Sequence, residues 1–355
     1  MRVLAFTKYD REAASTRQRL LQFLPALSAA GIDVDYRPLL DDAYVKCLAT
    51  GARAPKAAII RNYARRVGQL RRAPDYDLVW VYAELFPYLP ALFEKLAYFS
   101  RRPVIYDFDD AFFVPYDCHQ QALVRQLLGG KLKHLIAGAA AATCGNAFLQ
   151  AYAQPLCERT LIVPTVVDTA AYHPAIGATA GPVTIGWIGS PSTWANLQPL
   201  LPLLASLCRE YNVRVRAVGA GVQAERDQFD GLELVTWSER TEIRDVQAMD
   251  IGIMPLLDLP FQRGKSGYKL IQYMACGLPV VASPVGVNSE IVQPGIGLLA
   301  SSQTEWRAAL ERLIADPALR SSMGAAGRKR AVEAYSLASQ APRLVELFQS
   351  VGSRP

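Results

Sequence analysis

The chain has 355 residues, of which 51% are hydrophobic and 20% are charged, and its formal net charge is +6. This length suits two globular domains of about 150 residues each. No apolar run reaches the roughly 18 residues that a membrane span needs, and the N-terminal stretch MRVLAFTKYD lacks a signal-peptide layout, so we expect a cytoplasmic protein. Six cysteines without a C-x-x-C spacing, and three scattered histidines, argue against a disulfide framework or a zinc site.

Two strands and a helix are predicted at the N-terminus. The first strand is Val3–Thr7, and a loop without glycine joins it to a helix predicted over Thr16–Ala30. Ser15 is the expected N-cap of this helix, because a serine oxygen can accept from the free N–H groups of the first turn. Gly31 ends the helix, and a second strand is predicted at Ile32–Tyr36.

The surplus of positive charge lies mainly in one segment, which has no acidic residue and contains Arg53, Lys56, Arg61, Arg65, Arg66, Arg71 and Arg72. A helix is predicted over Lys56–Arg72, with these apolar residues on one face: Ile59, Ile60, Tyr63, Val67 and Leu70. A basic amphipathic helix can bind an anionic membrane surface, but the same pattern fits a surface helix that packs on a sheet. No aromatic-basic motif accompanies the segment, so nucleic acid is not an expected partner.

Three acidic side chains follow a predicted strand in the middle of the first half. Strands are predicted at Asp77–Tyr82 and Pro103–Tyr106, with a helix over Pro87–Phe99 between them. The second strand runs into Asp107-Phe108-Asp109-Asp110. Polar residues at the carboxyl end of a parallel strand face the ligand crevice of an open α/β sheet. These carboxylates are therefore candidates for binding or catalysis, although a helix cap with salt bridges would use the same residues.

The remainder of the first half continues the alternation of helices and strands. Residues 119–142 are predicted to be helical with a break at Gly129-Gly130, and a strand over 140–144 and a helix to about Ala153 follow. Leu161–Val163 is the last predicted strand of this half. Small residues together with Gly and Pro make 177–182 a predicted linker.

The second half restarts the same pattern. Val183–Ile188 is a predicted strand, and the turn Gly189-Ser190 leads to a predicted helix over 194–209; such a turn suits a phosphate group. Further strands are predicted at these ranges: 213–218, 232–236 and 250–255. Trp237 and Glu239 follow the second of them. Gly219–Ala224 matches G-x-G-x-x-A, but it follows the second strand of its half and not the first, so NAD is not an expected ligand.

The most informative stretch is Arg263–Glu290, RGKSGYKLIQYMACGLPVVASPVGVNSE. It predicts a helix over Tyr268–Ala275, then a short buried strand, VVAS, and a further helix that begins near Glu290. Lys265 and Lys269 lie at the start of the first helix. Backbone N–H groups at a helix start attract anions, and ammonium groups add to that attraction. A diphosphate group is the predicted ligand.

This stretch resembles the donor-binding segment of the family-4 glycosyltransferases, which have the GT-B fold. In that family two glutamates with seven residues between them precede the run M-A-x-G-x-P-V-V, and matching through MACGLPVV puts them at Gly264 and Gln272. Neither position is acidic, so the chain is similar to a divergent subgroup with the pattern G-K-x-G-[FY]-K-L. The segments PTVVDTAAYHP (164–174) and GNAFLQAYA (145–153) also resemble the family, the former at its interdomain junction.

The resemblance implies an α/β GT-B architecture, with two Rossmann-like domains whose parallel sheets face each other across a cleft. The N-terminal, acceptor-side domain would comprise residues 1–170 and 336–355, and the C-terminal, donor domain residues 171–335. Three further helices are predicted at 303–315, 317–333 and 336–351, and the last is expected to return to the first domain.

The resemblance also implies roles for individual residues. The catalytic residues would be Asp109, Lys265 and Lys269. The donor would be bound by Gly189, Ser190, Trp237, Glu239, Lys265, Gly267, Tyr268, Lys269, Gln272 and Glu290. The acceptor side would hold Ser15, Arg17, Arg19 and Asp110. Asp109 would accept the proton of the attacking hydroxyl or hold the transferred sugar. Trp237 could stack on the nucleobase, although a buried structural tryptophan fits equally well.

No metal ion is expected. Asp107-Phe108-Asp109 also matches the D-x-D metal clamp of the GT-A transferases, but such an enzyme would not need a second strand–helix series with its own phosphate turn. The expected function is that of a retaining, hexosyltransferase-like enzyme of polysaccharide biosynthesis that uses a UDP-, GDP- or dTDP-sugar and no further cofactor. The acceptor would be a glycan or a lipid-linked glycan, reached by a cytoplasmic protein that is peripheral on the inner face of the membrane through residues 56–72.

Two alternatives stay open. The first is a nucleotide-sugar epimerase or hydrolase of the same fold. The second is a catalytically silent subunit that binds a nucleotide sugar, and the absence of an acid pair at Gly264 and Gln272 favours it.

Overall fold

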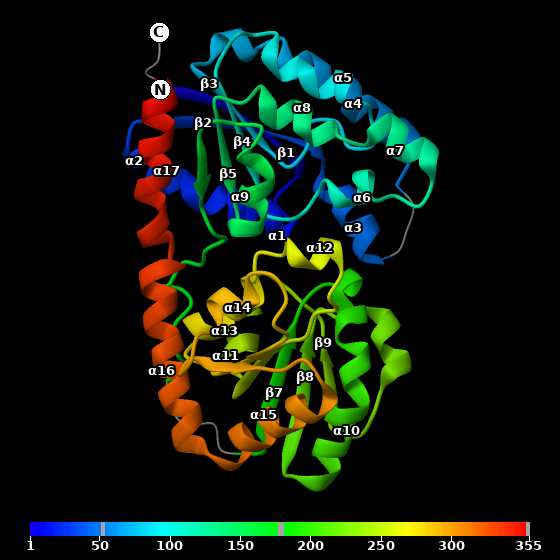
Figure 1. Ribbon diagram of the computed structural model, residues 1–355, viewed down its shortest axis with the longest axis vertical. Coiled ribbons are helices and arrows are strands. Elements are labelled where there is room, and N and C mark those ends of the chain that lie inside the picture. The colour runs from blue at the N-terminus through cyan, green and yellow to red at the C-terminus, as the bar shows by residue number, and fades with distance from the viewer. Residues whose placement is uncertain (51–53, 177–180, 353–355) are drawn as a thin grey trace. The chain divides into compact units, whose positions relative to one another are not determined.

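The computed structural model describes residues 1–50, 54–176 and 181–352, and the chain divides into two compact units. Unit 1 comprises Met1–Thr165, Arg263–Ser266 and Ser339–Pro355, and unit 2 comprises Val166–Gln262 and Gly267–Ala338. Each unit is built on its own six-stranded parallel sheet (Figure 1). Arg53 of the predicted basic segment, residues 177–180 of the predicted linker and the C-terminal residues 353–355 lie outside the described residues.

The sheet of unit 1 has the strand order β2-β1-β3-β4-β5-β6. Its strands are β1 (Arg2–Tyr9), β2 (Asp33–Leu40), β3 (Leu78–Tyr82), β4 (Val104–Phe108), β5 (Ala141–Cys144) and β6 (Thr160–Ile162). Strands β3, β4 and β5 are buried along their whole length, as expected of parallel strands covered on both faces. The chain passes from β1 to β2 on one side and then returns to β3 on the other, so the topological switch point lies between β1 and β3.

The first predicted helix is interrupted. Residues 14–29 form α1 (Ala14–Arg19), a 3-10 turn (Leu21–Phe23) and α2 (Leu24–Ala29), which has a proline in its first turn. The expected cap is wrong as well: Ala13 is the N-cap of α1, with no side-chain cap, and Ser15 lies inside the helix. Proline lacks the N–H that a continuous helix would use, which accounts for the new helix start.

The other helices of unit 1 are α3 (Asp42–Thr50), α4 (Lys56–Leu70), α5 (Ala91–Glu94), α6 (Val114–Asp117), α7 (Ala122–Leu128), α8 (Lys131–Ala137) and α9 (Ala147–Ala153). The predicted break at Gly129-Gly130 is confirmed, since Gly130 has φ 67° and is the N-cap of α8. The helix predicted over Pro87–Phe99 is only α5 and a 3-10 turn (Lys95–Tyr98), because the residues before Pro90 form a tightly bonded loop.

The buried face of α4 differs from the predicted one. Asn62, Arg66 and Leu70 are buried at successive i, i+4 positions, whereas Ile60 is 69% exposed. Arg66 is therefore not a surface cation; its guanidinium donates to the carbonyls of Thr7 (2.8 Å), Leu85 (3.4 Å) and Arg37 (3.1 Å). A long arginine in a helical pattern can be buried when backbone carbonyls accept from its terminal nitrogens, which the hydrophobic period cannot reveal.

The sheet of unit 2 has the order β12-β11-β10-β7-β8-β9. Its strands are β7 (Val183–Ile188), β8 (Val213–Val218), β9 (Leu232–Val235), β10 (Ile251–Met254), β11 (Val280–Ala282) and β12 (Gly297–Leu299). In order of appearance this is the 3-2-1-4-5-6 arrangement of dinucleotide-binding folds, and its switch point lies between β7 and β10. Strands β7 to β11 coincide with predicted ones.

Two separate cores cover the faces of this sheet, and neighbouring strand residues alternate between them. Trp187 packs with α10 (Leu201–Glu210) and α15 (Gln303–Ala315), whereas Ile188 packs in the core of the other face. That other core contains residues of α11 (Glu242–Gln247), α13 (Tyr268–Ala275), α14 (Asn288–Ile291) and α16 (Pro317–Ala334). The helix predicted over 194–209 begins as two 3-10 turns (Pro191–Asn196 and Gln198–Leu200), each with a proline in its first turn.

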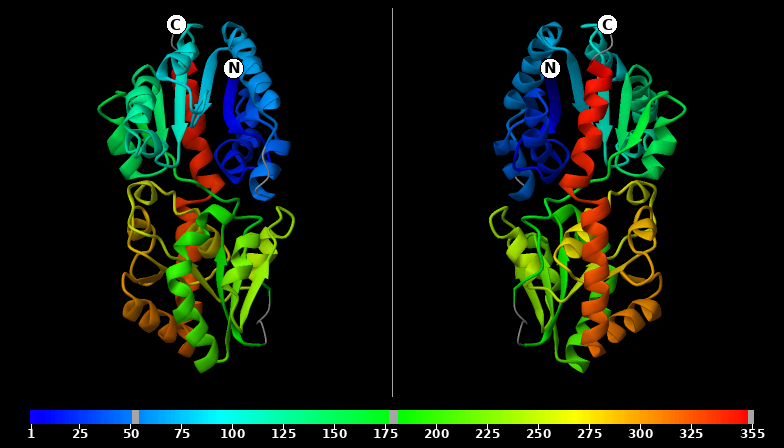
Figure 2. Two further views of the ribbon diagram at one scale, coloured as in Figure 1. Left: turned by 90° about the vertical axis from the view of Figure 1, so that its right-hand side faces the viewer. Right: turned by 90° about the vertical axis from the view of Figure 1, so that its left-hand side faces the viewer.

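The C-terminal helix α17 (Leu337–Gly352) packs on the sheet of unit 1, to which its residues from Ser339 onward belong (Figure 2). The ring of Phe348 meets Trp80 of β3 edge to face, with 5.0 Å between centroids. Across the described ranges, no helix is long and apolar enough to cross a membrane. A short helix, α12 (Pro260–Arg263), precedes the segment Arg263–Ser266 of unit 1.

Candidate functional site

The carboxyl ends of the strands mark the candidate site in each unit, because open parallel α/β sheets bind ligands there, at the switch point. In unit 2 this edge carries Gly189 after β7, Gly219 after β8 and Trp237 after β9. A Cβ on Gly219, which has φ 77°, would meet the Trp237 Cβ at 3.1 Å and the Gly189 carbonyl oxygen closer still. The ends of three successive strands therefore approach each other closely only because glycines stand there.

The turn after β7 is held by its own hydroxyl groups. The Ser190 N–H donates to Thr193 Oγ1 at 3.1 Å, and the Ser190 and Ser192 hydroxyls lie 3.0 Å apart. A Cβ on Gly189 would lie 2.7 Å from Thr193 Oγ1 and closer still to the Trp187 ring. The predicted residues Gly189 and Ser190 thus form a compact turn at the switch point, with Ser190 exposed.

The start of α13 lies against the same tryptophan. Gly267, with φ 70°, is the N-cap, and a Cβ there would clash with Ile291 and approach Val287 to 3.1 Å. The Lys269 ammonium lies 5.6 Å from the centroid of the Trp187 ring, within the range of a cation–π contact. Because Gly189 also packs on Trp187, the structure brings the predicted residues Gly189 and Lys269 to one ring at the sheet edge.

Lys265 lies with unit 1, although it is only four residues from Lys269. Its ammonium pairs with Asp110 at 2.9 Å, and each side chain is 22% exposed. The Asn146 amide donates to the carbonyls of Gly264 and Lys265, both at 3.1 Å, which fixes this short segment on unit 1. The predicted donor residue Lys265 and the predicted acceptor residue Asp110 are thus partners, a pairing that no local sequence pattern predicts.

Gln272, at the position of the second family glutamate, is buried in a polar network of unit 2. Its amide donates to Glu242 Oε1 at 2.9 Å and to the Tyr172 hydroxyl at 3.1 Å. Tyr172 and the indole N–H of Trp237 also donate to Glu242. Glu242, which was not among the predicted donor-binding residues, therefore supplies a carboxylate beside Gln272. Trp237 is anchored at its N–H and is only partly buried.

Three further donor-side candidates are Glu239, Glu290 and Tyr268, and Tyr268 interacts with Tyr172 of this network. Glu239 is exposed, and so is Glu290, whose carbonyl accepts from Arg330 at 2.8 Å. Tyr268 is half-buried at the first position of α13 and contributes, with burial and Glu242, to raising the pKa of Tyr172 above its ordinary value. Burial is the largest of these causes, and it keeps the Tyr172 phenol protonated as a donor.

The aspartates after β4 have two separate environments. Asp109 is 6% exposed and accepts from the Tyr82 hydroxyl at 2.7 Å and from Thr165 Oγ1 at 3.3 Å. A Cβ on Gly145 would lie 2.8 Å from the Asp109 Cα, so the glycine permits that close approach. Asp107 is buried and accepts from Thr143 Oγ1 at 2.6 Å and from the Arg19 guanidinium.

Arg19 was predicted to face the acceptor, but it is a buried structural residue. Its side chain is 2% exposed, paired with Asp107, and donates to the Val163 carbonyl at 2.7 Å. Burial lowers the pKa of Arg19, but the Asp107 carboxylate outweighs burial and the net pKa of Arg19 is raised, whereas burial raises the pKa of Asp107. Arg17 is half-buried and donates to the carbonyls of Arg11 and Glu12, and Ser15 is half-buried on α1.

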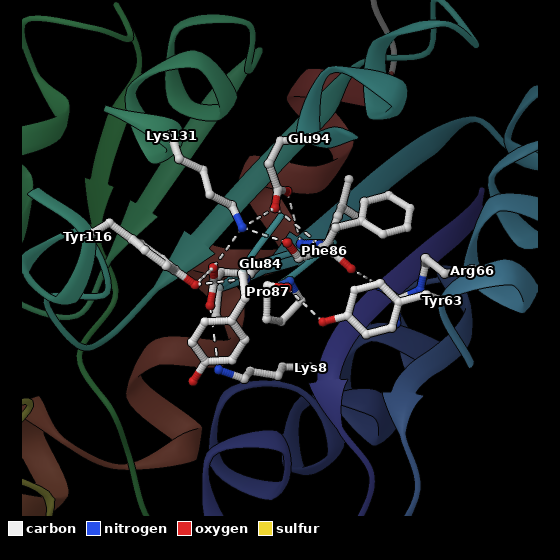
Figure 3. Close-up of polar contacts among 12 residues, drawn as sticks. Lys8, Tyr63, Arg66, Glu84, Phe86, Pro87, Glu94, Tyr116 and Lys131 are labelled. Carbon is white, nitrogen blue, oxygen red and sulfur yellow. Dashed lines mark hydrogen bonds and ion pairs between the residues drawn. The ribbon is translucent and has the colours of Figure 1, made fainter. Parts of the chain in front are cut away.

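A cluster of charged residues lies at the switch point of unit 1, where sequence reasoning missed it. Lys131 lies 3.0 Å from both Glu84 and Glu94, and Lys8 lies 3.5 Å from Glu84 (Figure 3). Lys8 is the second-last residue of β1, and Glu84 follows β3, so both lie at the edge at which ligands bind. The available signals were a lysine near the end of the first strand and an aromatic-rich loop, AELFPYLP, after the third.

Acidic and sulfur ligands do not gather as they would at a metal centre: no group of three or more His, Cys, Asp or Glu in the described part of the chain could hold a metal ion. Among the acids of the D-x-D match, Asp107 is occupied by Arg19 and Thr143, and Asp109 by Tyr82 and Thr165.

Comparison with known proteins agrees with this architecture. Residues 182–316 match the family model described as glycosyl transferases group 1. A D-inositol 3-phosphate glycosyltransferase of Kineococcus radiotolerans is 26% identical over 230 residues, 54% of this chain and 52% of the relative. A GDP-mannose-dependent monoacylated alpha-(1-6)-phosphatidylinositol monomannoside mannosyltransferase of Corynebacterium glutamicum is 35% identical over 86 residues, 24% of this chain and 23% of the relative. The chain thus spans about half or less of the curated relatives it matches.

Two solved structures are similar along nearly the whole chain. Sucrose-phosphate synthase from Thermosynechococcus elongatus has a TM-score of 0.75 at 16% identity, covering 99% of this chain and 98% of that one. HepE from Anabaena, in complex with UDP-glucose, has a TM-score of 0.74 at 15% identity, covering 99% of this chain and 100% of that one. The fold is GT-B, with two Rossmann-like domains, which confirms the predicted fold class. Residues 182–316 carry the likeness to the group 1 glycosyltransferases.

Proposed function

We propose that the protein is a glycosyltransferase that moves a sugar from a nucleotide-diphosphate sugar to a glycan or lipid-linked acceptor. The observation that carries the proposal is the meeting of Lys269 and the Gly189 turn at the Trp187 ring, at the switch point of unit 2. The likeness of residues 182–316 to group 1 glycosyltransferases supports it, as do the UDP and UDP-glucose complexes of HepE. The donor would be a UDP-, GDP- or dTDP-sugar.

The proposed chemistry places positive charge where the leaving group gains negative charge. As the glycosidic bond breaks, electrons pass to the diphosphate oxygen, and N–H groups at the start of α13 together with Lys269 would stabilise it. Such groups do this without a metal ion, so we propose a metal-independent reaction. We further propose retention at the anomeric carbon, following the family resemblance, with Asp109 as the group that accepts the acceptor proton or holds the transferred sugar.

The Lys269→Ala variant tests this assignment. Removal of one such cation costs on the order of 3–4 kcal/mol of barrier, so transfer should slow by roughly a hundred- to a thousandfold. Lys329→Ala is the matched control, because Lys329 lies on α16 of the same unit with its side chain 76% exposed. The rate of sugar transfer from a radiolabelled donor is measured for both variants and the wild type. Transfer at the full rate by Lys269→Ala would contradict the proposal.

Two alternatives remain distinguishable by experiment. An epimerase or hydrolase would turn the donor over rapidly in water without an acceptor, which product analysis reveals. A silent subunit would bind the donor in calorimetry but transfer nothing to any acceptor in an array. The replacement of the family acids by Gly264 and Gln272 favours the silent subunit, but Glu242 beside Gln272 offsets part of that loss by returning a carboxylate.

We also propose that the protein is cytoplasmic and peripheral on the membrane through α4. Exposed Ile60, flanked by exposed Lys56 and Arg61, presents an apolar group among cations on the helix surface. Sedimentation with anionic vesicles tests this: Ile60→Glu should release bound protein, whereas equal binding by both forms would count against the proposal.

A further inference from the structure

Lys8 is the partly exposed member of the charged cluster at the switch point of unit 1. Its ammonium lies 5.4 Å from the ring centroids of both Tyr9 and Tyr88 and 3.5 Å from Glu84, and its side chain is 15% exposed. Tyr88 is 69% exposed, and Tyr9 is stacked on Tyr44 with 6.2 Å between centroids. An ammonium group between aromatic rings is thus presented at the edge where ligands bind.

The loop that carries Tyr88 is held in a strained conformation. Ala83 and Tyr88 have φ of 63° and 61°, in the left-handed region that residues with a side chain seldom adopt. Hydrogen bonds fix both ends: Tyr106 donates to the Ala83 carbonyl at 2.8 Å, and the Tyr88 N–H donates to the Tyr116 hydroxyl at 3.1 Å. Such over-determined strain is characteristic of functional sites.

Further side chains fix the middle of the same loop. Lys131 donates to the Phe86 carbonyl at 2.6 Å, and Tyr63 donates to the Pro87 carbonyl at 2.7 Å (Figure 3). Glu94 accepts from the N–H groups of Leu85 and Phe86 at 3.0 and 3.1 Å. The loop therefore holds the Tyr88 ring over Lys8 without help from a ligand, which is the pre-organisation that a binding site needs.

The charges of this cluster do not balance. Lys8, Lys131 and Arg66 are cations, whereas Glu84 and Glu94 are the carboxylates beside them. Glu84 also accepts from the Tyr116 hydroxyl at 2.7 Å and pairs with Lys131. Its carboxylate therefore interacts with two other partners besides Lys8. Arg66 donates only to carbonyls in its described hydrogen bonds. Among these five residues, Lys8 is the one whose side chain is partly exposed.

We propose that Lys8 binds an anionic group, phosphate or carboxylate, on a sugar or polyol unit of the acceptor, and that Tyr9 and Tyr88 contact the ring of that unit. This inference rests on the proposed glycosyltransferase function and deepens it by naming the acceptor class. Ligand sites combine aromatic walls with a few placed polar groups, and an ammonium forms strong, charge-assisted bonds to phosphate and carboxylate. Phosphorylated and uronic acid acceptors share this chemistry.

The proposal is tested by measuring how tightly three matched probes bind to the full chain. The probes are D-glucose, D-glucose 6-phosphate and D-glucuronate, and ligand-observed NMR monitors their binding with and without UDP. We expect at least one anionic probe to bind about tenfold or more tightly than glucose, as a charge-assisted hydrogen bond implies. The preferred probe identifies the anion as phosphate or carboxylate. Equal binding of all three, or binding of none at millimolar concentration, overturns the proposal.

Two variants distinguish the contribution of Lys8 to probe binding from that of the Tyr88 ring. Lys8→Met should abolish the preference for anionic probes, because Lys131 and Tyr116 still satisfy Glu84 and the variant keeps its fold. Tyr88→Asn should weaken the binding of all three probes alike, because it removes the ring. The variant should keep the loop conformation, since asparagine tolerates a positive φ and retains the N–H that donates to Tyr116. Lys133→Met, which removes an exposed cation from α8 of the same unit, is the control and should change nothing.

These experiments also distinguish a failure of the Lys8 assignment from a failure of the proposed glycosyltransferase function. Retention of the anionic preference by Lys8→Met overturns the Lys8 assignment even when UDP binds and sugar transfer occurs. Absence of UDP binding to the wild-type chain contradicts the glycosyltransferase proposal, whereas the probe preference measured without UDP still decides the role of Lys8.

Discussion

The two units share a parallel α/β architecture but differ in where they keep their charges. In unit 1 the buried charged residues are Arg19, Arg66, Glu84, Glu94, Asp107, Asp109 and Lys131. In the described part of unit 2 only Asp245 is a buried charged residue. The edge of unit 2 is instead made of glycine turns, tryptophan rings and the network around Gln272.

This difference shows that similar topology does not fix the chemistry of a site. A buried charge is costly unless it is paired, so unit 1 has to hold its charges in fixed partnerships that also set the shape of its loops. Unit 2 offers backbone N–H groups, an ammonium and aromatic faces, which suit a diphosphate and a base. This difference is compatible with the proposed division of roles, in which unit 1 binds the acceptor and unit 2 the nucleotide.

Breaking the ionic cluster of unit 1 should have the largest effect on stability. Lys131→Met leaves Glu84 and Glu94 buried without the ammonium that lies 3.0 Å from both. Removal of one partner from a buried pair costs about 3–5 kcal/mol, because an uncompensated charge remains. Hydrogen exchange of the β1 and β3 amides, read by mass spectrometry, should show lost protection in unit 1 and little change in unit 2.

Lys133→Met is the control for this comparison, since it removes an equal charge from the exposed face of the same helix. Its exchange pattern should match that of the wild type. If both variants behaved alike, the buried ion pairs of unit 1 would not be the stabilising feature that distinguishes the two units.

In unit 2 the corresponding weak point is a glycine and not a charge. An alanine Cβ at Gly189 would lie 2.7 Å from Thr193 Oγ1 and press on the Trp187 ring. Overpacking of this kind costs about 1–3 kcal/mol and should displace the turn, weakening UDP binding as well. Differential scanning fluorimetry and calorimetric titration with UDP measure the two effects.

Gly68→Ala is the matched substitution in unit 1, because Gly68 is inside α4 and a Cβ there has no neighbour within 4 Å. Alanine should be neutral or stabilise by up to about 1 kcal/mol, as expected in a helix interior. An equal loss of stability at both glycines would mean that the tight turn after β7 is not special.

The same contrast explains how much the sequence could predict. The strands of unit 2 and α13 were predicted closely, because apolar runs and glycine stops are local signals. The turn at Gly189 and the position of Lys269 followed from that pattern. The pairing of Arg19 with Asp107 could not be foreseen, since 88 residues separate them and only tertiary packing joins them.

Unit 1 was harder to predict for the same physical reason. Its cluster joins Lys8, Glu84, Glu94 and Lys131, each from a different element, and no spacing in the chain encodes such a meeting. The helix expected over Pro87–Phe99 failed because hydrogen bonds from those side chains hold the preceding loop in another conformation. Arg66 looked like a surface cation because the carbonyls that satisfy it lie on distant strands and loops.

The smallest effect is expected from a substitution that restores one of the two family glutamates in unit 2. It adds a buried carboxylate and so makes that unit more like unit 1. In Gln272→Glu a second carboxylate replaces the amide that donates to Glu242 at 2.9 Å. Two adjacent carboxylates cannot both ionise easily, so the pKa of the pair should be raised in the folded state. The folded state then binds more protons than the unfolded state, so stability falls as pH rises from the unfolded value near 4.3 through the raised pKa.

The loss is about 1.4 kcal/mol for each unit of pKa difference, and we expect about one unit. Urea unfolding of the variant and the wild type at about pH 4 and about pH 8 measures it, with the exposed Gln154→Glu as the control. A pH-independent stability in Gln272→Glu would show that the network around Glu242 admits a second charge, and the contrast in buried charge between the two units would then be an accident of sequence and not a requirement of the site.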